Sequence, residues 1–268
     1  MRQILPLVLF SFLTTMISCQ KDVATPIEGP DPTPDTIVMK LLPQVIRNAE
    51  GTGYDSLVYD DKNRMIAYWS FDDWSVTRKM YSYAENGNPL KCQRYEKYGD
   101  ESEVLYENKE YTYNADGTVT EVSFTSSPKY TYRSIFFFNE KKQLIKEVRE
   151  DDGRVMQELT WDEKGRPATT GFADVVWSTT TYESYDENKG LLSAVVTPFI
   201  FDISMVNRIH TVNNPLRSVW RYVDKNGEPH SEANTFAYTY NEDGYPETID
   251  LLSYGTRSKV IITYIEAK

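Results

Sequence analysis

One short phrase recurs along this chain: two aromatic or apolar residues at spacing two, followed by a turn rich in Asn, Asp and Gly. Residues 238–244 (Tyr-Thr-Tyr-Asn-Glu-Asp-Gly) and 111–117 (Tyr-Thr-Tyr-Asn-Ala-Asp-Gly) are the clearest copies. The residue before each turn, here called the anchor, recurs every 23 to 30 residues. A period of this length holds about two strands and two turns, so the phrase predicts one β-hairpin per repeat. The anchors are Tyr59, Tyr83, Tyr113, Phe138, Trp161, Tyr185, Val212 (a degraded copy at 210–214) and Tyr240.

The fourth residue after each anchor indicates the turn geometry. Gly and Asn tolerate a positive φ at little cost, and they dominate hairpin turns for that reason. We predict a left-handed backbone at this position, at Gly117 and Gly244 in particular. Two copies have Lys142 and Lys189 there, and the second could use Gly190 instead. The remaining residues at this position are Asn63, Gly87 and Gly165.

The phrase also separates two faces of the predicted sheet. Alternate residues of a strand point to opposite faces, so each anchor shares a face with the residue two positions before it. That face is mostly aromatic, and the residue between is mostly Ser or Thr. Two strands per repeat give about sixteen antiparallel strands. Because their aromatic face must leave water and strands twist with a fixed hand, such a sheet cannot stay flat. We predict an all-β fold, an antiparallel β-hairpin repeat meander rolled on itself with the aromatic ladder inside. A small β-propeller with two repeats per blade is the alternative, and the sequence leaves a closed barrel and an open roll undecided.

The amino terminus has the features of an export signal. Arg2 is the only charge in residues 1–18, and the apolar run 4–17 is too short to cross a bilayer as a helix. We expect residues 1–18 to be a signal peptide, residues 19–36 to be a Pro-rich acidic tether, and residues 37–268 to be a single repeat β domain. A fully extended tether of this length reaches about 50 Å.

The end of the apolar run resembles the lipobox of bacterial lipoproteins, since Ser18 is followed by Cys19. This resemblance implies cleavage before Cys19, which becomes the acylated amino terminus. The segment 19–22 (Cys-Gln-Lys-Asp) also resembles the start of Bacteroidetes-type surface lipoproteins. It implies a lipid-anchored protein of the outer membrane that is exposed on the cell surface, with a periplasm-facing location as the alternative.

Charge and cysteine content narrow the possible partners. The net charge is −11 and becomes −12 once Arg2 leaves with the signal peptide, so binding to a nucleic-acid backbone is not expected. Only Cys92 remains beside Cys19, so no internal disulfide is expected.

No recognisable catalytic constellation occurs in the sequence. The nucleophile elbow, zinc-protease, P-loop and dinucleotide motifs are absent. His210, His230 and Cys92 are too widely separated in sequence to support a local zinc site. The segment 224–227 (Asp-Lys-Asn-Gly) resembles part of a calcium loop but lacks its later bidentate Glu. We therefore expect no catalytic residue, metal or cofactor.

Two polar residues interrupt the predicted aromatic face. Glu183 and His210 stand where neighbouring repeats have apolar residues. If the repeats stack in sequence order, these two approach each other and form a polar pair. A structural hydrogen bond is the alternative to a functional site.

The tryptophans are the candidate ligand-binding residues. Trp161 is an anchor and is expected in the core. Trp74, Trp177 and Trp220 are flanked by Ser, Thr, Asp or Arg, so each ring could be half exposed and could stack on a glycan or a protein partner. Trp69 has a similar setting, and packing within the sheet is the alternative for all of them.

The repeats resemble the YD repeats of RHS-type and wall-associated bacterial proteins. Tyr-Asp or Tyr-Asn heads begin at residues 59, 113, 185 and 240, and Gly117, Gly165 and Gly244 match the family's Gly. With the lipobox, the chain resembles Bacteroidetes lipoproteins of unknown function. The resemblance implies a β-hairpin array without known catalytic residues.

Three functional readings follow from the sequence. A surface-exposed binding module for glycan or protein is favoured. A lipid anchor and a tether would hold such a domain at the membrane, and aromatic rings outside the core could contact its ligand. A structural or assembly lipoprotein is the alternative, and a hydrolase is the third.

Overall fold

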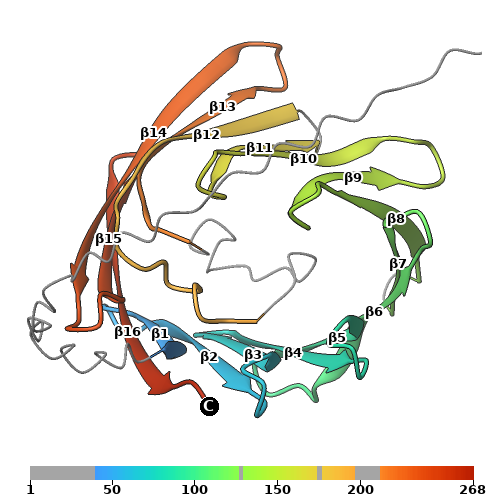
Figure 1. Cartoon of the computed structure of the whole chain (residues 1–268), viewed down its shortest axis with the longest axis horizontal. Helices are drawn as coiled ribbons and strands as arrows, with labels where there is room; N and C mark the ends of the chain where they lie inside the picture. Colours follow the sequence, from blue (N-terminus) through green and yellow to red (C-terminus); the bar gives the residue numbers. More distant parts are fainter. Residues whose placement is uncertain (1–39, 127–128, 174–176, 197–211) are drawn as a thin grey trace, which may run out of the picture. The chain divides into compact units, whose positions relative to one another are not determined.

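The computed structural model describes residues 40–126, 129–173, 177–196 and 212–268, and these form an antiparallel β-barrel (Figure 1). Each strand pairs with its neighbours in sequence, and β1 pairs with β16 to close the ring. The prediction of a rolled hairpin meander is confirmed, and the propeller alternative is wrong. The strands are β1 (Leu41–Asn48), β2 (Gly53–Tyr59), β3 (Met65–Asp72), β4 (Ser75–Tyr83), β5 (Pro89–Tyr98), β6 (Val104–Tyr113), β7 (Val119–Thr125), β8 (Thr131–Phe138), β9 (Leu144–Arg149), β10 (Val155–Trp161), β11 (Pro167–Ala173), β12 (Trp177–Tyr185), β13 (Pro215–Val223), β14 (Pro229–Tyr240), β15 (Pro246–Ser253) and β16 (Thr256–Glu266).

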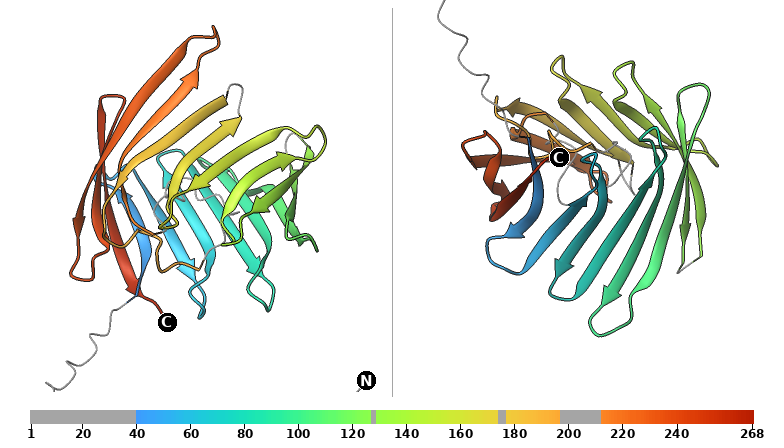
Figure 2. Two further views of the ribbon diagram at one scale, coloured as in Figure 1. Left: turned by 45° about the horizontal axis from the view of Figure 1, so that its top comes forward. Right: turned by 60° about the horizontal axis from the view of Figure 1, so that its bottom comes forward.

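The connections gather at two ends of the barrel (Figure 2). The phrase found in the sequence lies where an even-numbered strand turns into the next odd-numbered one, and we call this the repeat-turn end. Lys40, where the described chain begins, also lies there, because its carbonyl oxygen accepts a hydrogen bond from the Ala267 N–H at 2.8 Å. No helix with the length and apolarity needed to cross a membrane occurs among the described residues.

The repeat turns share one backbone geometry. In the first, the Asn63 N–H donates to the Asp60 carbonyl at 3.2 Å, and the Asp60 N–H donates to the Arg64 carbonyl at 3.0 Å. The predicted positive φ is confirmed at Gly117 (86°) and Gly244 (78°). It also occurs at Asn63, Gly87, Lys142 and Gly165.

The segment that resembles a calcium loop is another turn of this kind, at the opposite end. The Asp224 carboxylate accepts the N–H groups of Asn226 at 2.8 Å and Glu228 at 2.9 Å. Among the described residues no His, Cys, Asp and Glu side chains gather as a metal site.

The connection between β12 and β13 departs from the repeat. Residues 186–214 replace the expected turn, and Val212 lies in a bend before β13, so the degraded copy predicted there is wrong. Lys189 and Gly190 do not have a positive φ. Figure 1 shows the described part of this connection running inside the ring of strands. Leu191 is 1% exposed and packs in the barrel core, so the connection helps to fill the lumen near the repeat-turn end.

The lumen has an apolar layer and a polar layer. The aromatic ladder and the connection form the apolar layer near the repeat-turn end. Its members include Leu57, Tyr81, Tyr111, Phe136, Leu159, Leu191, Leu192, Ile249 and Ile262. Farther along the same strands the inward positions are polar. Buried residues there include Asp55, Lys79, Glu96, Glu121, Ser123, Ser134 and Gln157.

Polar tips of the inward rings bond to neighbouring backbone. Tyr59 donates its hydroxyl to the Pro43 carbonyl at 2.7 Å, and Tyr185 donates to the Pro167 carbonyl at 2.6 Å. Each bond joins an even-numbered strand to the first residues of the odd-numbered strand before it, and we call this ring of bonds the carbonyl girdle. Its other members are Tyr83 to Met65, Trp161 to Leu144, Tyr238 to Pro215 and Tyr264 to Pro246.

Candidate binding surface on the outer wall

Charged side chains are distributed over the outer wall of the barrel. Residues that alternate with the buried ladder point outward, and many of them are ionised. Lys91 and Glu110, for example, face each other across β5 and β6, with Nζ and Oε1 at 3.9 Å. The outward charged positions include Arg47, Arg78, Lys91, Lys97, Glu110, Arg133, Lys146, Glu158, Arg217, Arg221, Asp250, Arg257 and Lys259. Such a wall suits contact with water.

One part of this wall is aromatic. Tyr54 of β2 and Phe71 of β3 are direct cross-strand partners, and their rings stack with centroids 4.3 Å apart. Trp69, two residues before Phe71, lies parallel to it at 5.9 Å. Arg78 of β4 lies over Trp69 at 5.2 Å and over Tyr95 of β5 at 4.2 Å. We call these five residues the outer aromatic cluster.

A shallow cleft of about 260 Å³ lies on the cluster, lined by Tyr54, Ser56, Trp69 and Phe71. Phe71 stacks with both Tyr54 and Trp69, and the Arg78 guanidinium lies over the Trp69 ring. Tyr54 is 38% exposed and has no second ring stacked on it among the described residues. At the cleft the cluster therefore offers the partly exposed Tyr54 ring and the Ser56 side chain.

Arg78 is held in place by an acidic partner. Its Nε donates to Glu103 Oε1 at 2.9 Å, and its Nη2 donates to the other carboxylate oxygen. The hydrogen bond from Arg78 is the largest effect on the Glu103 carboxyl and lowers its pKa. A guanidinium with two hydrogen bonds loses little further freedom when a partner packs on it.

Trp74 lies in the connection that follows β3. Its side chain is 80% exposed. Asp72 Oδ1 accepts the Trp74 N–H at 2.8 Å and the Ser75 N–H at 2.6 Å, which fixes the backbone that carries the ring. The N–H of Trp74 is the largest of the effects that lower the Asp72 pKa. An apolar ring exposed to this degree can be contacted by a binding partner.

The other two candidate tryptophans are placed differently. Trp220 shares the inward face of β13 with Ser218, so it lies on the lumen side and not on the outer wall. It stacks on Tyr222 at 4.1 Å and meets the edge of Tyr254 at 5.9 Å. Trp177 begins β12, and its side chain lies outside the described residues. Trp74 and Trp220 therefore do not share one surface.

The predicted Glu183–His210 pair has one described member. β12 carries a bulge between Tyr182 and Ser184, which moves Glu183 off the aromatic face and places Tyr182 opposite Ser218. Glu183 is exposed and accepts a hydrogen bond from Arg217 Nε. The expectation that Glu183 lies in the ladder is corrected by this bulge. His210 lies outside the described residues, as does Cys19.

A buried charge network lines the lumen on β6 and β7. Lys109 Nζ lies 3.2 Å from Glu121 Oε1 and 4.0 Å from Glu107 Oε1. Burial and the neighbouring carboxylates act in opposite directions on Lys109, and the carboxylates raise its pKa. Burial raises the pKa of Glu121, whereas Lys109 and two hydroxyl donors, Ser123 and Tyr132, overcome burial and lower that of Glu107.

Within this network the ion pair of Lys109 with Glu121 joins β6 to β7. Cys92 pairs with Lys109 across β5 and β6. Burial raises the pKa of its thiol to about 12, which keeps it protonated and unreactive. The sequence contained the signal for the network, because Glu107 and Lys109 alternate within one strand, but it did not show which face they occupy.

Comparisons with known proteins identify no family for this chain. No family model matches it, and no curated protein matches it. Among solved structures, it is similar to a porin-like protein from Bacteroides vulgatus ATCC 8482, with 13% identity over 84% of this chain and 99% of that one and a TM-score of 0.42. It is also similar to a porin-like protein from Bacteroides uniformis ATCC 8492, with 14% identity, coverage of 85% and 98%, and a TM-score of 0.40. Likeness at this level carries no argument about function.

Proposed function

We propose that this chain is a lipid-anchored protein of the cell envelope whose barrel stands in water and binds a protein partner through the outer aromatic cluster. The observation that carries the proposal is an aromatic and guanidinium cluster on a wall that carries charged side chains on most of its strands. Cys19 supplies the membrane anchor, and residues 19–36 supply the tether.

The chemistry of the wall supports a barrel outside the bilayer. A strand position that faces lipid at the bilayer centre excludes charge, since Lys or Arg there costs about 2–4 kcal/mol. The outward positions of this barrel carry charges on most of its strands, including Glu110 in β6, Arg217 in β13 and Lys259 in β16. The anchoring function therefore falls to the amino-terminal lipid and not to the strands.

The position of the cluster on the barrel is consistent with a surface that is exposed to a partner. The described chain begins at Lys40, at the repeat-turn end. Tyr54, Phe71 and Trp74 lie toward the opposite end, beside the connections from β1 to β2 and from β3 to β4. The candidate surface thus lies at the end of the barrel opposite Lys40, the first described residue.

The ring geometry favours a protein over a glycan. Sugars stack on open ring faces, and each ring of this cluster already contacts another ring or the Arg78 guanidinium. Trp, Tyr and Arg are the residues that dominate binding energy at protein interfaces, where packed edges and a fixed guanidinium are as useful as faces.

A site-specific crosslink in cells that export and acylate the full chain tests the proposal. A photoreactive phenylalanine analogue replaces Trp74, and the crosslinked partner is compared between the otherwise unchanged chain and a Tyr54→Ala, Trp69→Ala variant. We expect a discrete adduct that the double variant loses. A third protein combines the same crosslinker with Trp220→Ala, which removes a lumenal ring of the same type, and it should retain the adduct.

Three outcomes would contradict the proposal. The absence of any discrete adduct would favour the structural or assembly lipoprotein. An adduct unaffected by the double variant would place the partner elsewhere on the barrel. Binding of the purified chain to a glycan array, lost on Tyr54→Ala, would replace the protein partner by a sugar.

A further inference from the structure

The carbonyl girdle is interrupted at two consecutive even-numbered strands. In β8 the anchor is Phe138, which has no hydroxyl. In β6 the anchor is Tyr113, whose hydroxyl has no hydrogen-bond partner among the described residues. By the pattern of the other strands, Tyr113 would donate to the first residue of β5, Pro89, and the β8 anchor to the first residue of β7, Val119.

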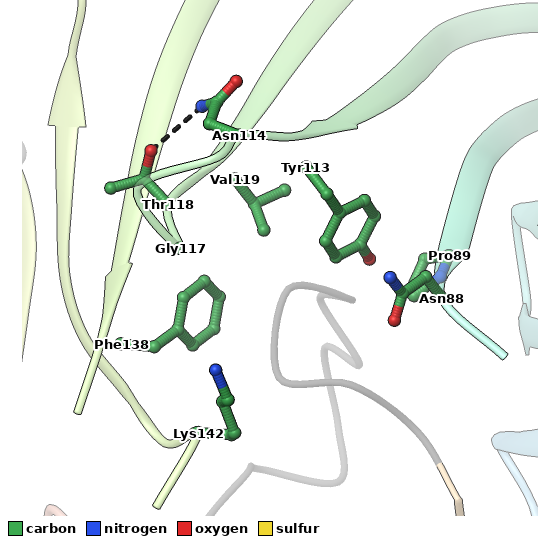
Figure 3. A pocket seen from close by; sticks show the side chains of 9 residues that line it. All are labelled: Asn88, Pro89, Tyr113, Asn114, Gly117, Thr118, Val119, Phe138 and Lys142. Atoms are coloured by element: carbon green, nitrogen blue, oxygen red, sulfur yellow. Dashed lines mark hydrogen bonds between the residues drawn. The ribbon is translucent and has the colours of Figure 1, made fainter. Parts of the chain in front are cut away.

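A cavity of about 350 Å³ lies where these two bonds are missing (Figure 3). Its lining contains both anchors, Tyr113 and Phe138, and both of the residues that they fail to reach, Pro89 and Val119. The cavity is therefore a consequence of the two changes in the girdle. Its size falls in the range of small-molecule sites, about 300–1,000 Å³.

The walls of the cavity combine apolar rings with a few polar groups. Figure 3 shows the rings of Tyr113 and Phe138 on either side of Val119, with the side chains of Asn88 and Lys142 directed toward the same space. Burial raises the pKa of Tyr113 to about 12, so its hydroxyl stays protonated and can donate a hydrogen bond. Lys142 has no carboxylate partner within ion-pairing distance among the described residues.

The backbone at Lys142 is unusual for a side chain of this size. Its φ is 62°, in the left-handed region that favours glycine. At the same turn position four repeats have Gly and one has Asn. Lys142 therefore occupies a turn position that favours Gly, and its side chain lines the cavity.

We propose that this cavity binds a small organic carboxylate with an apolar body. The carboxylate accepts hydrogen bonds from the Lys142 ammonium group and the Tyr113 hydroxyl, and the apolar body packs between the Tyr113 and Phe138 rings. This site lies at the repeat-turn end, apart from the outer aromatic cluster, and it does not depend on the protein partner proposed above.

Titration of the purified full-length chain with phenylacetate tests the proposal, with phenylacetamide as the neutral analogue of the same shape. Chemical shifts of the Lys142 turn and calorimetry report binding. We expect saturable binding of phenylacetate that is about tenfold tighter than that of the amide, since a charge-assisted hydrogen bond is lost with the amide.

Two pairs of variants separate the site from effects on folding. Lys142→Gly removes the ammonium group and suits the positive φ, so it should weaken phenylacetate binding about tenfold without lowering the Tm. Lys141→Gln removes the neighbouring exposed charge and should leave binding unchanged. Tyr113→Phe should weaken binding with little change in Tm, whereas Tyr185→Phe should lower the Tm and leave binding unchanged.

Several results would overturn the proposal. Equal affinity for phenylacetate and phenylacetamide would show that the carboxylate is not recognised. Unchanged affinity in Lys142→Gly, or equal losses in Lys141→Gln, would remove the role of the placed ammonium group. Absence of saturation up to about 10 mM phenylacetate would mean that the cavity is not a site for this class of ligand.

Discussion

Each repeat turn requires one residue with a positive φ, and the chain meets this requirement with three residue types. Gly has no Cβ and adopts the conformation freely, as at Gly117 and Gly244. Asn63 adopts it with a φ of 60°, which an Asn side chain tolerates by local hydrogen bonding. Lys142 has neither advantage, so turn formation alone does not explain why a Lys occupies this position.

A substitution that adds only a Cβ measures this requirement. At Gly244 the added Cβ meets nothing within 4 Å, so backbone strain is the whole effect. We expect Gly244→Ala to lower the free energy of unfolding by roughly 1–2 kcal/mol in chemical denaturation. Glu242→Ala, in the same turn but without a positive φ, should change it by less than about 0.5 kcal/mol. Equal effects of the two would refute the assignment of strain to Gly244.

The carboxylate of Asp72 predicts a pH dependence of the turn that carries Trp74. The N–H groups of Trp74 and Ser75 lower the Asp72 pKa below its ordinary 3.8. A carboxyl whose folded pKa is lowered stabilises the fold above the unfolded pKa, and this stabilisation is lost as pH falls through the folded value. We expect the Asp72 carboxyl carbon to titrate below 3.8 by NMR, with the Ser75 amide shift following it. A midpoint at or above 3.8 would contradict the hydrogen bonding described here.

At the scale of elements, the carbonyl girdle joins six of the eight even-numbered strands to their predecessors at the repeat-turn end. Removing one hydroxyl leaves a carbonyl without that partner and costs about 1–3 kcal/mol. We therefore expect Tyr185→Phe to lower the free energy of unfolding by this amount, since its hydroxyl donates to Pro167. Tyr113→Phe removes a hydroxyl with no partner among the described residues and should change stability little. Equal losses in urea unfolding would mean that the girdle bonds do not contribute.

The connection 186–214 is the second element that organises this end. Leu191 is buried in the barrel core, so Leu191→Ala should destabilise the chain by about 2–5 kcal/mol through lost contacts and a new cavity. Ser193→Ala, two residues later on the exposed side, serves as the control in the same thermal and urea unfolding experiments. A Leu191 variant as stable as the control would show that the connection does not pack into the lumen.

Local patterns predicted the repeat turns but not this connection. In the sequence, the Asn213–Asn214 pair resembles a degenerate copy of the repeat turn. In the structure, Asn214 is buried and donates its side-chain amide to the Lys189 carbonyl at 2.8 Å. The adjacent pair Leu191–Leu192 breaks the alternation of a strand, and that was the available signal. The bulge at Glu183 likewise could not be predicted, because a bulge shifts the face of one residue without changing the neighbouring sequence.

At the scale of the whole molecule, closure depends on a pairing that no local pattern contains. Ile46 of β1 lies opposite Ile262 of β16, more than two hundred residues away. A barrel and a propeller share the same hairpins, but the barrel also pairs every hairpin with the next and closes through β1 and β16. The side of the wall that each Trp occupies depends on strand register, since a shift of one residue exchanges the two faces. From the sequence, Trp69 and Trp220 could not be distinguished, because both have polar neighbours. In the structure Trp69 faces outward and Trp220 faces the lumen.

For the whole molecule we propose that the strands face water and that a lipid on Cys19 attaches the chain to the membrane. Charged outward positions disfavour burial of the strands in lipid, whereas an acyl chain would supply binding energy for the membrane.

Membrane fractionation of Cys19→Ala, expressed as the full chain in cells that acylate the parent protein, tests this claim most directly. We predict that the parent protein pellets with membranes after a high-salt wash and that the variant remains in the supernatant as a folded barrel. Far-ultraviolet circular dichroism of the released protein confirms the fold. A folded variant that still pellets with washed membranes would contradict the account, because it would show that the barrel itself is held by the bilayer.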